Sequence, residues 1–209
     1  MKIVVFGASR GVGLKVVEQA LEAGHMVTAF VRSADRFTLQ HPNLKVFQGD
    51  ALDAAAVEKA MAGQDAVISA LAPTRPLVAG MMEIAARNII NAMKKNGIER
   101  IISTTGAGIR QVEDQPKFID RFIAFALNLV AKSVVLDSIA NVKVIQASKL
   151  DWTIVRFPRL TDGPHTKTYR VGYVDQNSGS QISRADGADF IVKELIEKNW
   201  SKKLPLVSY

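Results

Sequence analysis

The stretch that decides the fold is KIVVFGASRGVG, residues 2–13. It begins with a short apolar run, continues with three closely spaced glycines and leads into an amphipathic segment at 14–22. A strand, a glycine-rich turn and a helix in this order are typical of a loop that holds a pyrophosphate. Gly7 would make the tight turn, Gly11 would let the backbone approach the phosphates, and Gly13 would let the helix pack on the strand. The N-terminus of that helix offers free N–H groups and a partial positive charge to an anion.

The composition excludes several classes of site. Hydrophobic residues make up 48% of the 209, enough to fill a sizeable core. The absence of cysteine excludes disulfides, thiolate metal sites and thiol nucleophiles. The three histidines lack metal-ligand spacing, so we expect them at the surface and expect no metal site. Neither a signal peptide nor a membrane-spanning apolar stretch is recognisable, so we expect a cytoplasmic protein without a membrane contact.

The net charge of +7 comes from scattered lysines and arginines. A nucleic-acid surface would need basic residues clustered with exposed aromatic side chains. We therefore expect no nucleic-acid partner, and the charge fits an anionic dinucleotide more simply.

Strand-like and helix-like segments alternate to the end of the chain. The expected strands after the first are 27–31, 44–47, 66–70, 100–103, 152–157 and 204–208, and the expected later helices are 53–61, 78–95 and 184–198. Such alternation predicts one α/β domain over 1–209, a doubly wound, mainly parallel Rossmann sheet with helices on both faces. A small C-terminal substrate region, about 158–209, would pack on it. The apolar segment 118–127 favours a helix, which would be buried on the sheet, contact another subunit or cover a ligand site.

The end of the second strand predicts which dinucleotide binds. In this fold that position meets the adenosine ribose, and an acidic residue there would bind the 2′-hydroxyl of NAD. Here Arg32 and Ser33 follow the strand, and Arg10 lies in the glycine turn. Because two cations suit a 2′-phosphate, the sequence favours NADP(H).

Further candidates follow the third, fourth and fifth strands. Asp50 can accept a hydrogen bond from the adenine amine or cap local backbone, and small residues at 70–72 would let the backbone pass close to the cofactor. The hydroxyls of Thr104 and Thr105 would face the crevice or bond to local backbone. The predicted cofactor-binding residues are Gly7, Ser9, Arg10, Gly11, Val12, Arg32, Ser33, Asp50, Ala51, Ala70, Leu71, Ala72, Thr104 and Pro158.

Over its whole length the chain resembles the atypical short-chain dehydrogenases/reductases, the group that includes NmrA-like proteins and biliverdin reductase B (flavin reductase). The resemblance rests on the glycine turn and on six further stretches: Val31-Arg32, Gly49-Asp50, AGQDAVI at 62–68, ARNII at 86–90, LDWTIVR at 150–156 and ISRAD at 182–186. The turn reads Gly-x-x-x-Gly-x-Gly, closer to the standard short-chain enzymes than to the atypical group.

A second departure concerns catalysis. Standard members use a Tyr-x-x-x-Lys pair as proton donor, but no tyrosine of this chain has a lysine four residues later. The resemblance implies an NADPH-dependent reductase that passes hydride to a flavin, quinone or similar planar acceptor. Thr105 aligns with the family's active-site serine and is the catalytic candidate, although it can equally bond to cofactor or backbone. The alternatives are a non-catalytic NADP(H)-binding sensor of the NmrA type and, more distantly, a nucleotide-sugar epimerase. We expect a monomer or homodimer, with Pro158 near the nicotinamide and the second ligand. His165 is expected at the surface, and the alternative is that it touches a substrate from the loop after the sixth strand.

Overall fold

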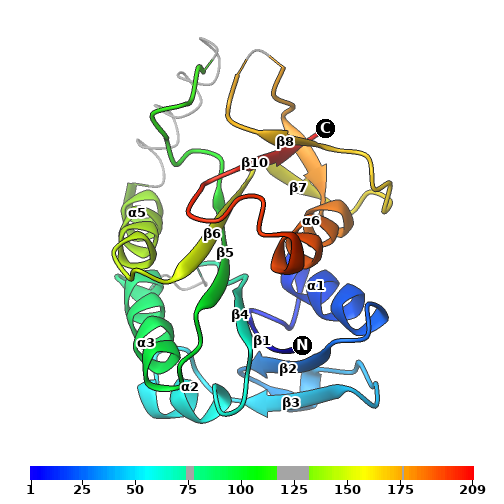
Figure 1. Ribbon diagram of the computed structural model, residues 1–209, viewed down its shortest axis with the longest axis vertical. Coiled ribbons are helices and arrows are strands. Elements are labelled where there is room, and N and C mark those ends of the chain that lie inside the picture. Colours follow the sequence, from blue (N-terminus) through cyan, green and yellow to red (C-terminus); the bar gives the residue numbers. More distant parts are fainter. Residues whose placement is uncertain (74–77, 117–131, 176) are drawn as a thin grey trace.

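The computed structural model describes residues 1–73, 78–116, 132–175 and 177–209, and the expected helix at 118–127 lies outside them. Its main sheet has the strand order β3-β2-β1-β4-β5-β6-β10-β8 (Figure 1). All neighbours are parallel except β8, which runs antiparallel to β10. The strands are β1 (Lys2–Phe6), β2 (Met26–Val31), β3 (Leu44–Gln48), β4 (Ala66–Ser69), β5 (Arg100–Gly106), β6 (Asp151–Phe157), β8 (Arg170–Gly172) and β10 (Leu206–Ser208). The order of the first six is that of the Rossmann fold, and it reverses between β1 and β4.

Helices cover both faces of this sheet, as predicted. One face carries α1 (Gly11–Glu22) and α6 (Arg184–Glu197), and the other carries α2 (Ala54–Ala60), α3 (Met81–Lys95) and α5 (Lys132–Gln146). Strand β1 shows why both faces need cover. Ile3 and Val5 enter the core on the side of α1, while Val4 and Phe6 enter the core on the side of α3. All four are fully buried, which is typical of parallel strands.

Several element boundaries differ from the expected ones. Helix α3 begins at Met81 instead of Val78, because Gly80 before it takes a left-handed conformation with φ 71°. Strand β5 runs on to Gly106 instead of ending at Ser103, since its whole length pairs with β6. The sequence did not predict α5 or the short strands β7 (Arg159–Thr161), β8 and β9 (Gln181–Ser183), of which β7 and β9 form a parallel pair of their own.

A buried ion pair fixes the segment that follows β5. Arg156 on β6 is fully buried, and its guanidinium donates to both carboxylate oxygens of Asp114 at 2.7 and 2.9 Å. The same arginine donates from Nε to the carbonyl of Leu204 at 2.8 Å. Asp114 also accepts the backbone N–H of Val174 at 3.0 Å. The pair therefore connects β6 to the segments that contain Asp114, Val174 and Leu204.

No helix in the described part of the chain has the length and apolar character needed to cross a membrane.

Candidate cofactor site

A cavity of about 870 Å³ opens where the parallel strands end. The glycine turn after β1, the residues that follow β2, β3 and β4, and the ends of β5 and β6 line it, together with the first residues of α3 and α6. This is the edge of the sheet at which the strand order reverses, and ligands bind there in doubly wound folds. The volume lies near the upper end of the range for small-molecule sites, about 300–1,000 Å³.

The glycine turn is shaped by close contacts that exclude side chains. A Cβ on Gly7 would overlap the backbone carbonyl of Ala70, and a Cβ on Gly13 would overlap the carbonyl of Gly7. Both glycines therefore let β1, β4 and α1 pack together. Gly11 differs, because a Cβ there would meet only the Nε of Arg184 at 3.8 Å. Its open side faces the cavity, as a cradle for an approaching ligand requires.

The N-terminus of α1 presents unpaired donors to this cavity. The first intrahelical bond runs from the N–H of Leu14 to the carbonyl of Arg10 at 3.3 Å, so the N–H groups of residues 11–13 precede the hydrogen-bond ladder. The first turn carries no acidic residue. Unpaired N–H groups and the helix dipole together favour an anion here.

Among the described residues, four cationic side chains line the cavity. Arg10 and Arg32 were predicted, and both lie there, while Lys15 and Arg184 were missed by the sequence analysis. Lys15 and Arg184 have carboxylate partners, Glu18 and Asp162, each at 2.7 Å. Ser33 does not line the cavity; it precedes a 3₁₀ turn (η1, Ala34–Arg36) and is exposed. The expected contact of Ser33 with a ligand therefore has no support in this conformation.

The end of the cavity near β2 and β3 combines a ring with a carboxylate. A Cβ on Gly49 would lie 2.6 Å from the ring of Phe30, so only glycine fits there. Phe30 itself packs against Phe6, with ring centroids 4.6 Å apart. One carboxylate oxygen of Asp50 accepts the N–H of Leu52 at 2.9 Å, and the side chain lines the cavity. Asp50 thus makes the local backbone bond that was the alternative to an adenine contact, and it also lines the cavity.

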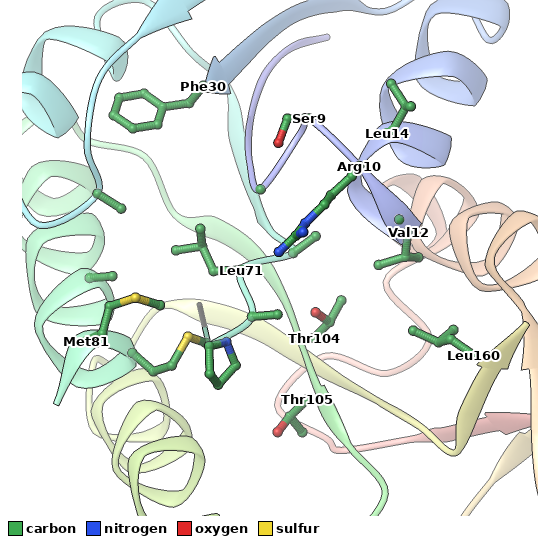
Figure 2. A pocket seen from close by; sticks show the side chains of 18 of the residues that line it. Ser9, Arg10, Val12, Leu14, Phe30, Leu71, Met81, Thr104, Thr105 and Leu160 are labelled. Atoms are coloured by element: carbon green, nitrogen blue, oxygen red, sulfur yellow. The ribbon is translucent and has the colours of Figure 1, made fainter. Parts of the chain in front are cut away.

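Much of the remaining lining is apolar, and it lies on both sides of the cavity, with Met81 on one side and Leu160, near Val12, on the other (Figure 2). The predicted residues in this part of the lining are Ala70, Leu71, Ala72, Thr104, Thr105 and Pro158. Four larger apolar side chains that were not predicted join them: Val78, Met81, Met82 and Leu160. The hydroxyl of Thr105 makes no hydrogen bond within the described part of the chain, so it is available to a ligand.

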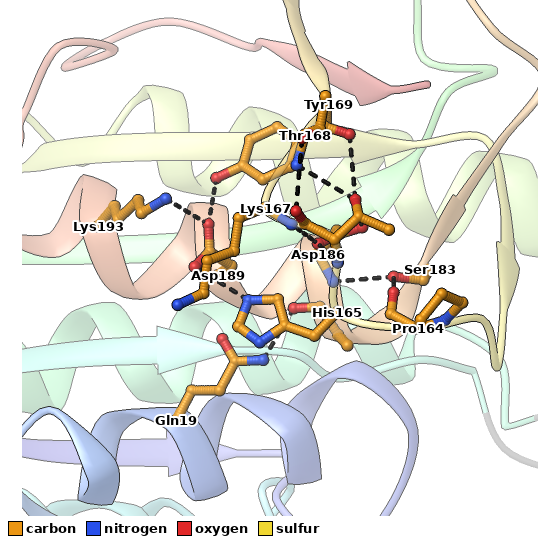
Figure 3. Close-up of polar contacts among 12 residues, drawn as sticks. Gln19, Pro164, His165, Lys167, Thr168, Tyr169, Ser183, Asp186, Asp189 and Lys193 are labelled. Carbon is orange, nitrogen blue, oxygen red and sulfur yellow. Dashed lines mark hydrogen bonds and ion pairs between the residues drawn. The ribbon is translucent and has the colours of Figure 1, made fainter.

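The three tyrosines lie away from this cavity. Tyr169 donates to a carboxylate oxygen of Asp189 at 2.6 Å, and burial together with that carboxylate raises the pKa of its phenol. Figure 3 shows the same carboxylate group bound by His165, whose Nε2 lies 3.1 Å from Oδ1. His165 is thus engaged on α6 and does not line the cavity, unlike the substrate contact considered from sequence. The hydroxyl of Tyr209 donates to Asp186 at 2.8 Å.

The described residues contain no group of three or more histidine, aspartate or glutamate side chains placed to hold a metal ion. The expectation that all histidines are exposed was wrong for His25, which is only 8% exposed. His25 follows α1, and its Nδ1 lies 3.4 Å from the N-terminal amine of Met1. Burial and this positive charge lower its pKa.

The chain is similar to known proteins over nearly its full length. A family model described as NAD(P)H-binding matches residues 7–198. The uncharacterized protein YwnB of Bacillus subtilis is 27% identical, covering 93% of this chain and 92% of its own. The structure of ChuY, an anaerobillin reductase from Escherichia coli O157:H7, has a TM-score of 0.80 and 26% identity, covering 100% of this chain and 97% of its own. A short-chain dehydrogenase/reductase from Veillonella parvula in complex with NADP has a TM-score of 0.83 and 20% identity, covering 100% and 94%.

Proposed function

Because the chain belongs to the NAD(P)H-binding family, we propose that it is an NADPH-dependent reductase of a planar, conjugated acceptor. One observation carries the proposal: the same cavity has cationic side chains beside the glycine turn and a mostly apolar lining elsewhere. A dinucleotide with a 2′-phosphate suits the first part, and an aromatic acceptor suits the second. Within this proposal we expect the protein in the cytoplasm, as a monomer or homodimer.

The cofactor fits the residues that are present. Gly11 leaves a cradle that a Cβ would fill, and the first N–H groups of α1 supply donors for the pyrophosphate. Arg32 and Arg10 would hold the 2′-phosphate, and Asp50 would accept from the adenine amine. Thr104 and Pro158 would then border the nicotinamide.

The bound cofactor would supply a hydride. In the balanced reaction, NADPH, one proton and the oxidised acceptor are converted to NADP⁺ and the acceptor reduced by two electrons. The protein's part is to stack the acceptor against Met81, Met82 and Leu160 and to keep bulk water from its face. Thr105 would hydrogen-bond the acceptor. Because none of the three tyrosines is among the residues that line the cavity, the proton would come from water, as a flavin or quinone allows.

The acceptor class is proposed from two sources. The apolar lining favours flat aromatic molecules such as flavins and quinones. The similarity to ChuY adds anaerobillin to the candidates. The lack of a tyrosine or histidine among the described lining residues also favours one alternative, an NADP(H)-binding regulator of the NmrA type without turnover.

The test follows the oxidation of NADPH in the presence of FMN, a panel of quinones and anaerobillin, with reactions lacking the protein as the blank. We expect protein-dependent oxidation with at least one acceptor, faster with NADPH than with NADH. Tight NADPH binding without turnover on any acceptor would favour the regulator instead. If the protein binds neither NADPH nor NADH, both the reductase and the regulator proposals fail.

A further inference from the structure

We propose that Arg184, near the C-terminal end of the chain, binds the pyrophosphate of the cofactor across from the glycine turn. This would join the C-terminal part of the chain to the cofactor site. The inference rests on the proposed function, because it assumes that the cavity holds NADP(H).

The placement of the guanidinium carries the inference. Arg184 lines the cavity, and its Nε lies 3.8 Å from the point where a Cβ on Gly11 would stand. Among the described residues, no other atom outside the turn and the backbone of α1 lies within 4 Å of that point. In a turn of this kind, the second glycine leaves room for the phosphates to approach the backbone. The guanidinium of Arg184 therefore borders the space in which the pyrophosphate would lie.

The backbone of Arg184 is held in place from two sides. On the side of α1, Gln19 donates from Nε2 to the carbonyl of Ala185 at 2.9 Å. On the other side, the fully buried carboxylate of Asp186 accepts the N–H groups of Thr166 and Lys167 at 2.9 and 2.8 Å. Figure 3 shows these contacts gathered at the start of α6. The first turn of α6 is thus anchored to α1, so the side chain reaches the cavity from a fixed base.

The partner that Arg184 has in this structure is weakly held. Its NH1 group donates to Asp162 at 2.7 Å, but the side chain of Asp162 is 91% exposed. Ion pairs this exposed contribute little, because water and salt compete for both groups. A pyrophosphate offers several anionic oxygens to the planar fork of donors on a guanidinium, which makes shorter and stronger bonds. Arg184 can therefore exchange Asp162 for the cofactor or bridge the two.

With Arg184, the cofactor would have a cation at the pyrophosphate in addition to Arg10 and Arg32 at the 2′-phosphate. Arg10 belongs to the glycine turn near the start of the chain, and Arg184 belongs to α6. In this arrangement neither Arg10 nor Arg184 would contact the nicotinamide or the acceptor. The loss of Arg184 should accordingly weaken every ligand that has a pyrophosphate and spare ligands that lack one.

The experiment compares two ligands on the wild type and on Arg184→Gln. Adenosine 2′-monophosphate has the 2′-phosphate but no pyrophosphate, whereas NADPH has both. We expect R184Q to raise the Kd for NADPH about ten-fold, as the loss of a charge-assisted contact would. The Kd for adenosine 2′-monophosphate should stay within about two-fold of the wild type. The variant R184K should recover part of the loss, since lysine keeps the charge but not the fork.

The matched control is Arg159→Gln, which removes an exposed arginine on β7 that bonds to Gln181 and does not line the cavity. R159Q should bind both ligands as the wild type does. Added salt should also weaken NADPH binding less in R184Q than in the wild type, a readout that a purely structural role would not move.

Three results would overturn the inference while leaving the proposed function standing. One is an unchanged Kd of R184Q for NADPH. Another is an equal loss of both ligands, which would indicate general damage. The third is a raised KM for the acceptor at an unchanged Kd for NADPH, which would assign Arg184 to the acceptor. If the wild type itself binds no NADPH, the proposed function has failed, and the inference falls with it.

Discussion

Replacing Gly11 with alanine should weaken NADPH binding by at least about 100-fold while leaving the fold almost intact. Gly11 has φ 62°, and the added methyl would meet only Nε of Arg184 at an ordinary contact distance of 3.8 Å. The cost to the fold is therefore that of the left-handed backbone, about 1–2 kcal/mol. A less flexible unfolded chain offsets about 0.4–1 kcal/mol of this. We expect G11A to lower the free energy of unfolding by about 1 kcal/mol.

Gly24 provides the matched control at the other end of the same helix. Its φ is 80°, nothing lies within 4 Å of the added methyl, and it does not line the cavity. G24A therefore introduces the same kind of strain without touching the candidate site. In urea denaturation the two variants should lose similar stability, which separates strain from binding.

The effect on binding should be large for Gly11 alone. A methyl in the cradle keeps the pyrophosphate away from the N–H groups at the start of α1, and each hydrogen bond to a charged group contributes about 1.5–3 kcal/mol. Losing two of them raises the Kd by at least about 100-fold. Titrating NADPH by fluorescence against wild type, G24A and G11A measures this. If G11A binds NADPH as tightly as G24A, the pyrophosphate does not lie on this turn.

Three further predictions concern the specificity, the chemistry and the stability of the protein. Arg32→Gln should raise the Kd for NADPH about ten-fold and leave the Kd for NADH unchanged. The control Arg36→Gln, outside the cavity, should change neither Kd. If the ratio of the two Kd values is the same in R32Q as in the wild type, Arg32 does not bind the 2′-phosphate. Thr105→Ala should lower kcat about five-fold without changing the Kd for NADPH. Thr105→Ser, which keeps the hydroxyl, should restore kcat. Equal kcat values for the wild type and both variants would show that Thr105 has no part in the reaction. Asp114→Asn should lower the free energy of unfolding by about 3–5 kcal/mol at pH 7, because Arg156 stays buried without its counter-charge. Burial opposes ionisation of Asp114, but its bonds from Arg156 and from backbone N–H groups outweigh this and hold its pKa below the usual value. The stabilisation is therefore present above about pH 4 and is lost as the pH falls through the lowered pKa, so urea curves of wild type and D114N should converge in acid.

The first half of the fold could be predicted from local patterns. Strand β1 is the apolar run that opens the chain, and Asp53, the first residue of the expected helix 53–61, caps α2 by accepting the N–H groups of Ala55 and Ala56. Each of these signals is carried by neighbouring residues, and that is why sequence alone reveals them. The cavity residues that follow β1, β2, β3 and β4 were found for the same reason, since each lies just after an apolar strand.

The later half depends on contacts between distant segments. Strands β7 and β9 have three residues each and exist because they pair with one another. Arg184 faces Gly11 only because α6 packs on α1, and no local pattern records that packing. Met81 and Met82 are the first residues of α3 and line the cavity, which the sequence did not reveal. Such residues are found from the tertiary structure, and the strand that precedes Arg184 was itself not predicted.

The central claim is that the cavity beside the glycine turn binds NADP(H). A calorimetric titration of the wild-type protein with NADPH and then NADH tests it most directly. The account predicts one site per chain and a Kd for NADPH at least about ten-fold below that for NADH, because only NADPH has a 2′-phosphate for Arg32 and Arg10. Binding of neither nucleotide, or tighter binding of NADH, would contradict it.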